Sequence, residues 1–371
     1  MFINTGDYVE HIRDDVLRSS YYTFTPLPLM EGSFYSMNDA LAESLADVHR
    51  ILGFLEGMIS VIPDTEALAD LLLFRESCFS KMIDYPDVDI RRILLEQANT
   101  KPNREIQNIK SAYHYAMEKP ASKLSYSAII NHALHGDGSK RASDIRNKHL
   151  FLSPSTANYQ QYNPTAPRNI KTALNDIDKY IESNRADPLI KTAMCHYQFE
   201  IIHPYDCYNG IVGRIFPYHI LSNTKMKAMR FFAISASLYR HKYEYFDKLG
   251  ETQKSGNYPI WIDFFIRIIK DAAQSSIAFF QCHDALSRND EEKILAHRQN
   301  RTDHTLDVYR HFRKNIVSSI GHTSEQLQLS FHTISRSVTI LQELGILIQV
   351  TEGNRNRIFA HPGLMEQLIL P

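Results

Sequence analysis

Apolar residues recur at helical spacing along most of the chain up to about residue 283. Within residues 38–60 they lie three or four positions apart, which places them on one face of a helix. These residues are Leu41, Leu45, Val48, Leu52 and Leu55. The stretch before Pro28 shows no clear period. We therefore predict a nearly all-helical region over residues 35–283.

Two interruptions divide this helical pattern. A helix is expected over 64–80, and residues 87–134 contain further helical patterns that a polar break at 99–103 separates. Residues 136–168 are polar and contain glycines and prolines that cannot sustain a long helix. The apolar run His149–Leu152 within them favours a strand, so we expect a short hairpin or flap there.

Helical spacing returns at Ile170. Asp187 and Pro188 are typical of a helix start, because aspartate caps free N–H groups and proline lacks one. We expect the helix that they open to end at Ile202, just before His203 and Pro204.

Residues 301–371 have a different pattern. TSEQLQLS predicts a short helix, and SFHTISRSVTILQEL predicts a longer one that begins at Ser330 and ends at Gly345. ILIQV and RNRIFAH then predict two strands joined by a turn. This order is typical of a winged helix-turn-helix. The predicted DNA-facing residues are His332, Thr333, Ser335, Arg336 and Thr339 on the helix, and Arg355 and Arg357 on the wing. Such domains also serve as dimerisation or docking modules.

Composition limits the class of protein. Lys+Arg number 41 and Asp+Glu 42, for a net charge of -1, so any nucleic-acid surface must be local. The four cysteines form no CxxC pair, which fits free thiols in a reducing compartment. The N-terminus lacks the apolar core of a signal peptide, and no apolar run approaches the ~20 residues of a membrane helix. We expect a cytoplasmic protein without a membrane partner.

The segment HPYDCYNGIVGR, residues 203–214, contains the candidate chemistry. Asn209 and Gly210 favour a turn that leads into a helix, whose first N–H groups form an anion site. Arg214 lies one turn further and can add a contact to phosphate. His203 can accept a proton near neutral pH. The same pattern also fits an ordinary turn between two helices.

This segment resembles the Fic family motif H-P-F-x-[D/E]-G-N-G-R-x-x-R, and similarity extends over about residues 35–283. The resemblance implies a mainly helical Fic-type core with a β-hairpin flap. It divides the chain into a Fic-associated N-terminal region (1–100), the core (101–283), a linker or linking helix (284–300) and the winged helix (301–371). It also implies transfer of AMP from ATP to a Ser, Thr or Tyr hydroxyl of a protein substrate, with Mg²⁺ as a cofactor.

The motif transfers unevenly to this sequence. By resemblance, His203 is the base, Asn209 and Gly210 bind the anion, and Arg214 contacts the distal phosphates. Three departures affect the site: Cys207 replaces the acidic metal ligand, Tyr208 replaces a glycine, and Ile211 replaces an arginine. A neutral thiol is a poor ligand for Mg²⁺. Asp206 is acidic but one position early, and it is the candidate metal ligand.

Many Fic proteins carry an inhibitory helix with the signature S/T-x-x-x-E-G/N. Residues Ser80 to Tyr85 match it in register, with Asp84 in place of the glutamate. The resemblance implies that Asp84 pairs with Arg214 and blocks ATP. An ordinary helix end with a solvated aspartate is the alternative.

Two functions stay open from the sequence. The first is an adenylyltransferase whose activity is weak or lost, because a metal ligand and an arginine are missing where charge develops. The second is a non-catalytic regulator that binds DNA through its C-terminal domain. Either is compatible with a homodimer.

Overall fold

The computed structural model describes most of the chain. The residues outside the described part are 1–5, 15–18, 63–64, 99–102, 121–124, 137–143, 151–161, 184–185, 225, 298–301 and 354–355. The described part is mainly helical, as the periodicity predicts.

The N-terminal half contributes five helices to the described part. They are α1 (Asp39–Val61), α2 (Thr65–Asp84), α3 (Ile90–Ala98), α4 (Arg104–Glu118) and α5 (Tyr126–His135). The five apolar residues of the predicted stripe in α1 are all buried. The helices expected over 38–60 and 64–80 are thereby confirmed, although α2 continues to Asp84.

The middle of the chain adds six α-helices and two short 3-10 turns among the described residues. They are η2 (Pro167–Asn169), α6 (Ile170–Glu182), α7 (Pro188–Ile202), α8 (Asn209–Ser222), η3 (Lys227–Phe231), α9 (Ile234–Arg240), α10 (Lys242–Ser255) and α11 (Tyr258–Ala296). The side chain of Asp187 accepts the N–H of Leu189, and α7 ends at Ile202. Both ends of α7 therefore agree with the sequence prediction.

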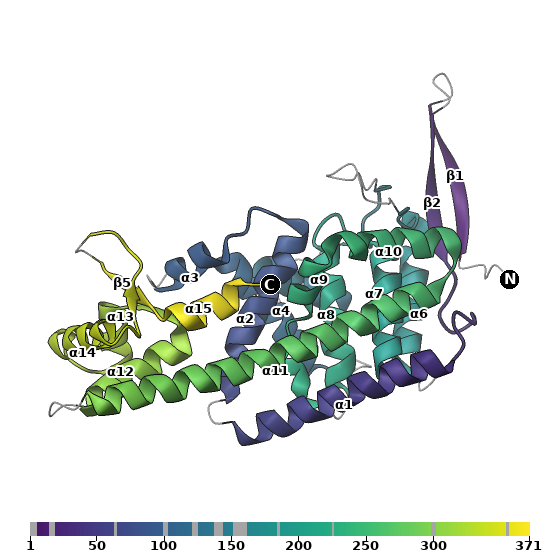
Figure 1. Cartoon of the computed structure of the whole chain (residues 1–371). Helices are drawn as coiled ribbons and strands as arrows, with labels where there is room; N and C mark the ends of the chain where they lie inside the picture. The colour runs from purple at the N-terminus through teal and green to yellow at the C-terminus, as the bar shows by residue number, and fades with distance from the viewer. Residues whose placement is uncertain are drawn as a thin grey trace.

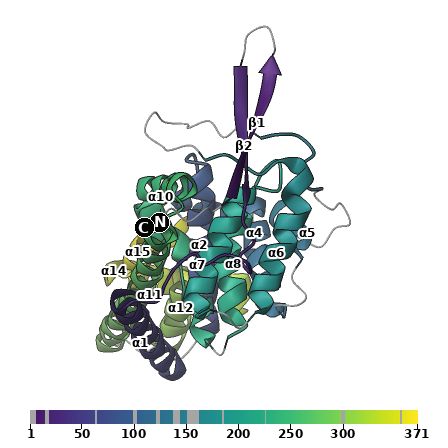
Figure 2. The same ribbon diagram turned by 90° about the vertical axis from the view of Figure 1, so that its right-hand side faces the viewer.

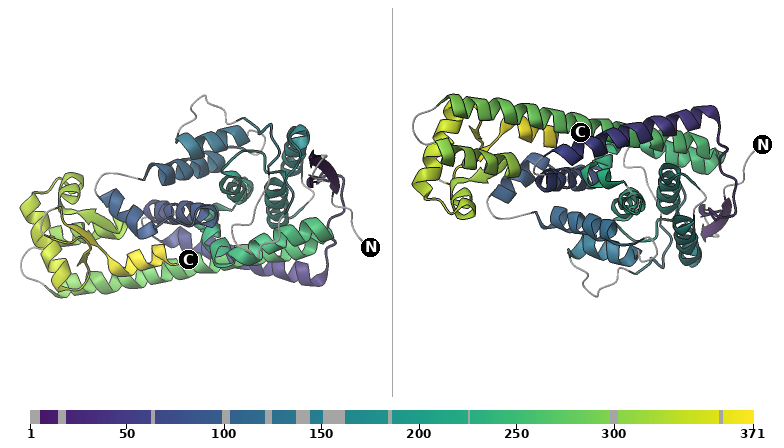
Figure 3. Two further views of the ribbon diagram at one scale, coloured as in Figure 1. Left: turned by 90° about the horizontal axis from the view of Figure 1, so that it is seen from above. Right: turned by 90° about the horizontal axis from the view of Figure 1, so that it is seen from below.

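The long helix α11 runs along the length of the molecule, and α1 packs along it (Figures 1 and 3). Helices α2, α7 and α8 lie in the interior of the bundle (Figure 1). Nearly every residue of α7 and α8 is buried. The loop between these two helices is therefore fixed by the centre of the core.

A two-stranded antiparallel hairpin, β1 (Gly6–Asp14) and β2 (Ser19–Pro26), precedes the helices. It projects from the helical body (Figure 2). Phe24 at its base is fully buried, whereas Tyr8 and Tyr22 are 44% and 48% exposed. Because only the base packs on a core, the strands have no regular alternation of apolar and polar residues, which explains why no period was predicted there.

The predicted flap is described only in part. His149 and Leu150 are not in a strand, so the strand expected over His149–Leu152 is wrong at these two positions. Its other two residues lie outside the described residues. Residues 162–166 form neither a helix nor a strand. Phe24 N donates to Pro164 O at 3.3 Å, so the N-terminal hairpin joins the end of the flap region.

The C-terminal unit has the predicted order of helices and strands. It contains α12 (Thr302–Asn315), β3 (Val317–Ser319), α13 (Ile320–Leu327), α14 (Phe331–Glu343), β4 (Ile348–Gln349), β5 (Ile358–Ala360) and α15 (Pro362–Ile369). The strands form an antiparallel sheet in the order β3-β5-β4. Ser330 caps α14 by accepting the N–H of Thr333, as expected. Assignment to the winged helix-turn-helix fold stays a prediction.

The region expected to be a linker or linking helix is helical through Ala296, as the end of α11. Asp290 in this stretch pairs with His361 at 2.7 Å, and both side chains are 5% exposed. The C-terminal unit has its own apolar cluster, but α15 packs on the main core. A buried hydrogen bond and a shared core thus connect the two parts. Among the described helices, none is long and apolar enough to span a membrane.

Candidate active site

The loop from His203 to Tyr208 joins the buried helices α7 and α8. His203 follows the last residue of α7 and adopts a left-handed conformation with φ of 49°. Tyr208 precedes α8 with φ of 63°, again left-handed. A glycine would adopt this conformation without strain, and Tyr208 stands where the Fic motif has one.

Arg146 fixes this loop from the flap region. Its guanidinium donates to the carbonyl oxygens of His203 at 2.7 Å, Lys148 at 2.9 Å and Ile202 at 3.2 Å, and also to that of Thr165. Arg146 is 3% exposed. Arg146 was not predicted from the sequence, because no local signal identifies one arginine within a polar segment as buried.

Asn209 closes the loop on itself. Its Oδ1 accepts Tyr205 N at 2.8 Å, and its Nδ2 donates to Tyr205 O at 2.7 Å. Asn209 is buried as the first residue of α8. Its amide therefore shapes the loop, and the contribution to an anion site falls to the helix N-terminus behind it.

His203 lies within this loop as a neutral imidazole. Its Nδ1 is 3.2 Å from Glu200 O, so we assign the ring proton to Nδ1, which leaves Nε2 as the acceptor. Desolvation lowers the pKa of His203 to about 4, and the positive charge of Arg146 acts in the same direction. The buried Tyr162 faces it edge-on, with ring centroids 6.3 Å apart. An unprotonated imidazole at neutral pH is the form that a general base requires.

Arg214 pairs with α2, as the inhibitory resemblance implies. Its Nη2 is 2.6 Å from Asp84 Oδ2 and 2.7 Å from Ser80 O, and its Nε donates to Ser80 Oγ at 3.1 Å. The side chain of Arg214 is 1% exposed and that of Asp84 is 26% exposed. Burial alone would lower the pKa of Arg214, but the carboxylate of Asp84 raises it. The predicted contact between Asp84 and Arg214 is confirmed.

The carboxylate of Asp84 lies over the first turn of α8. A Cβ atom placed on Gly210 would be 2.8 Å and 3.0 Å from the two carboxylate oxygens and 2.7 Å from Arg214 Nη1. A side chain at position 210 would therefore displace the carboxylate or the guanidinium of this ion pair. The negative group beside the helix N-terminus is thus part of the protein itself.

Glu200 lies beneath the same turn. A Cβ atom on Gly213 would be 2.2 Å from Glu200 Oε1, and this oxygen has no hydrogen-bond partner in the described structure. Burial raises the pKa of Glu200 to about 8, although the positive charge of Arg214 acts against this. Glu200 is therefore mostly protonated at neutral pH. Its signal in the sequence was a charged residue inside the apolar run of α7.

The motif residues do not fit a magnesium site of the family type. Asp206 and Cys207 are exposed. Burial and the neighbouring Asp206 raise the pKa of the Cys207 thiol, which keeps it neutral. Within the described ranges, no three His, Cys, Asp or Glu side chains converge to hold a metal ion. Asp206 as a ligand of Mg²⁺ stays a prediction.

The residues expected to contact DNA are spread over the C-terminal unit. Arg336 is exposed on α14, and the hydroxyl of Thr333 lies 2.8 Å from that of Ser330 at the helix start. The guanidinium of Arg357 stacks over Phe359 at 5.4 Å. Arg355 lies outside the described residues. DNA binding stays a prediction.

Residues 85–221 match the Fic/DOC family. The fold resembles a Fic family protein from Desulfovibrio desulfuricans with a TM-score of 0.57 and 15% identity, over 88% of this chain and 97% of that one. A Fic domain containing signaling protein from Bacteroides thetaiotaomicron matches at a TM-score of 0.48 and 12% identity, over 62% and 96% of the two chains. Fic-1 from C. elegans matches at 0.48 and 15%, over 65% and 73%.

The matched segment contains α7, the His203 loop and α8, which are the elements that build the site. Its two ends lie at Tyr85, just after Asp84, and at Leu221 in the last turn of α8. The match to the Fic/DOC family over residues 85–221 thus contains the loop and both helices of the candidate site.

Proposed function

We propose that this chain is a nucleotide-binding Fic protein related to the adenylyltransferases, closed by Asp84 and with weak or absent AMP transfer. The observation that carries the proposal is the Asp84 carboxylate over the N-terminus of α8, in contact with Arg214. A helix N-terminus and an arginine together favour phosphate. In this structure the Asp84 carboxylate lies beside the helix N-terminus and the arginine, where we expect a phosphate to bind.

The expected chemistry follows from the position of His203. Its free Nε2 accepts the proton of a Ser, Thr or Tyr hydroxyl on a protein substrate. The hydroxyl oxygen forms a bond to the α-phosphorus of ATP, and the bond to the bridging oxygen breaks as pyrophosphate leaves. Arg214 and the N–H groups of α8 stabilise the charge on the phosphates. The proton remains on His203 until solvent removes it.

Three residues of this chain oppose the reaction. Cys207 offers no carboxylate to a metal ion, and Ile211 is buried and offers no positive charge. Tyr208 packs against Tyr85 with ring centroids 5.9 Å apart, so the loop and the end of α2 obstruct the same space. Each lost charge contact costs roughly a few kcal/mol of transition-state stabilisation. We therefore expect AMP transfer by the native chain to be undetectable or very weak.

The test restores the motif in an open background. With α-labelled ATP, we expect background labelling for the native chain and for Asp84→Ala alone. Adding Cys207→Asp, Tyr208→Gly and Ile211→Arg to Asp84→Ala should produce labelling of the chain or of added protein. His203→Ala in the restored chain is the matched control and should abolish the signal. Strong labelling by the unaltered chain would contradict the proposal.

A further inference from the structure

The segment that closes the candidate site rests on the C-terminal unit. Asp84 is the last residue of α2, and α3 begins six residues later at Ile90. Helix α3 packs chiefly on β3 and α15 of the C-terminal unit, and α15 also packs on α2 (Figure 1). The carboxylate over Gly210 is therefore flanked along the chain, on both sides, by helices that contact this unit.

The contact with α15 is apolar. Leu364, Met365 and Leu368 of α15 are at most 5% exposed. They share one buried apolar cluster with residues of α2 and α3, among them Phe79 and Ile93. Because burial of apolar side chains is the main favourable contribution to such packing, α15 stays docked while this cluster is intact.

A polar contact joins the end of α15 to α2. Arg75 Nη2 donates to Leu370 O at 2.7 Å, and Arg75 is 7% exposed. The guanidinium also lies over the ring of Phe79 at 5.3 Å, and Phe79 directly precedes Ser80. Arg75 Nε has no hydrogen-bond partner in the described structure. A carbonyl of the C-terminal unit thus holds a buried cation of α2 shortly before the residues that engage Arg214.

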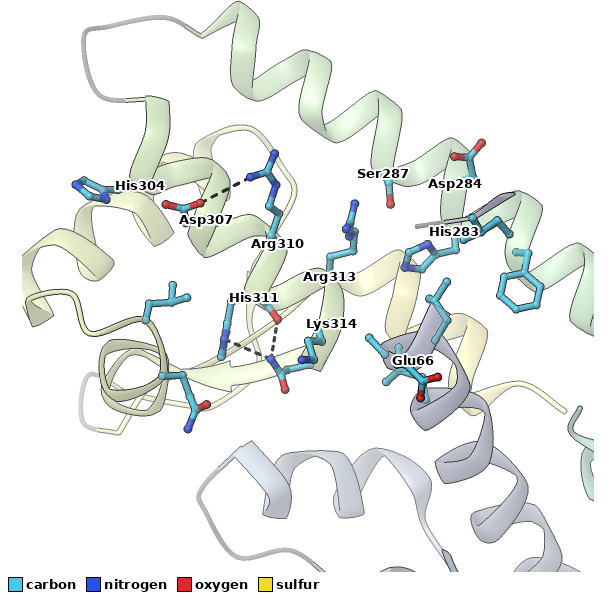
Figure 4. Close-up of a pocket in the computed structure, with 18 of the residues that line it drawn as sticks. Glu66, His283, Asp284, Ser287, His304, Asp307, Arg310, His311, Arg313 and Lys314 are labelled. Carbon is cyan, nitrogen blue, oxygen red and sulfur yellow. Dashed lines mark hydrogen bonds and ion pairs between the residues drawn. The ribbon is translucent and has the colours of Figure 1, made fainter. Parts of the chain in front are cut away.

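The same unit does not cover the start of α2. A cleft of about 660 Å³ lies there, between α2, α11, α12 and α13, and Glu66 and Lys314 are among the residues that line it (Figure 4). The unit therefore holds α2 through α15 and not along its whole length. The cleft gives the unit room to shift relative to α2.

We propose that the C-terminal unit is a clamp on the closed site. Its β3 and α15 hold α3 and the end of α2 in the position that sets Asp84 against Arg214, and displacement of α15 opens the site. This regulation rests on the function proposed above, because what it controls is access of a nucleotide to Arg214. By linkage, a nucleotide that displaces Asp84 must in turn weaken the docking of α15.

Hydrogen exchange of the full chain tests the clamp without a nucleotide. Leu368→Ala removes a fully buried side chain of α15 and leaves a cavity in the shared cluster. We expect amides within residues 80–98 to exchange about tenfold faster than in the native chain. Leu52→Ala is the matched control, because Leu52 is a buried leucine of α1, which packs on α11. It should leave exchange in this segment unchanged.

A milder variant covers the case in which the larger cavity prevents folding. Leu368→Val removes one methylene group and should change the exchange of residues 80–98 in the same direction by a smaller factor.

Calorimetric titration with ATP connects the clamp to the site. We expect Leu368→Ala to bind ATP about threefold more tightly than the native chain, because a larger fraction of molecules is open. The gain is limited because α2 also packs on α4 and α9, which are unchanged. In the Asp84→Ala background the same substitution should add no further gain, since the closing carboxylate is already absent.

The outcomes separate the clamp from the function on which it rests. Exchange over residues 80–98 that is unchanged in both Leu368 variants would overturn the clamp. An ATP gain from Leu368→Ala that adds in full to that of Asp84→Ala would also overturn it, as would no gain where Asp84→Ala alone binds ATP more tightly. If Asp84→Ala brings no gain either, the proposed function fails, and the exchange data alone decide whether α15 holds the end of α2.

Discussion

The cations near the two ends of α2 differ in whether the chain itself supplies their counter-charge. At its C-terminal end, Arg214 is buried and satisfied by Ser80 and Asp84 of the chain itself. At its N-terminal end, the cleft of about 660 Å³ lies between α2, α11, α12 and α13. Lys314 of α12 lines this cleft, and it is exposed and has no ion-pair partner in the described structure. A cation that the fold neutralises supports the structure and must be released before it binds a ligand. A cation that the fold leaves open contributes little to stability and is ready for one.

The largest expected difference concerns stability. Replacement of Arg214 by Met leaves the buried Ser80 and the partly exposed Asp84 carboxylate without their donor. We expect the free energy of unfolding in urea to fall by about 3–5 kcal/mol. The matched change at the open end, Lys314→Met, should alter it by less than about 0.5 kcal/mol. Similar losses for the two variants would remove the distinction between the ends.

The next largest expected effect concerns Glu200, the buried acid near the Arg214–Asp84 ion pair, and the pH dependence of stability. The pKa of Glu200 is raised from 4.5 to about 8, so between these values the folded chain retains a proton that the unfolded chain releases. Stability must therefore fall as pH rises through this window.

Glu200→Gln removes this titration and keeps the shape of the side chain. Relative to the native chain, the variant should gain on the order of 2–4 kcal/mol of unfolding free energy between about pH 4.5 and pH 8. Lowered histidine pKa values act on both chains alike and cancel in the difference. Glu43→Gln, an exposed change on α1, is the control and should show no such gain. A gain that is independent of pH would indicate a packing effect.

Several helices were predictable from local signals in the sequence, either an apolar face or a capped start. The apolar stripe of α1 and the proline cap of α7 are local signals, and both appear in the structure as expected. The contact between Asp84 and Arg214 was predictable only through the family motif, because 130 residues separate the two. The ion pair itself is confirmed, whereas its inhibitory role stays a prediction.

The features that the sequence did not reveal depend on tertiary contacts. Arg146 is polar in a polar segment, and its burial arises only because the carbonyls of the His203 loop converge on it. The β1–β2 hairpin projects away from the core and so lacks the alternation that identifies a half-buried strand. The cleft at α12 combines four elements from distant parts of the chain, and no spacing indicates it.

The smallest expected effect is on ATP affinity, when the Asp84 carboxylate that pairs with Arg214 is removed. In Asp84→Ala the carboxylate over Gly210 is removed, so phosphate no longer meets a negative charge there and Arg214 Nη2 regains a free donor. We expect ATP to bind this variant about tenfold more tightly than the native chain in calorimetric titration, or about 1.4 kcal/mol. The gain is limited because Ser80 still engages Arg214 and because Cys207 and Ile211 are unchanged.

Glu66→Ala, which removes an acid from the opposite end of the same helix, is the matched control and should leave ATP affinity unchanged. Adding Arg214→Met to Asp84→Ala should cancel the gain, since the benefit requires the released guanidinium. If the double variant binds ATP as tightly as Asp84→Ala, the phosphates contact some other part of the chain, and the closed state of Arg214 does not control nucleotide access.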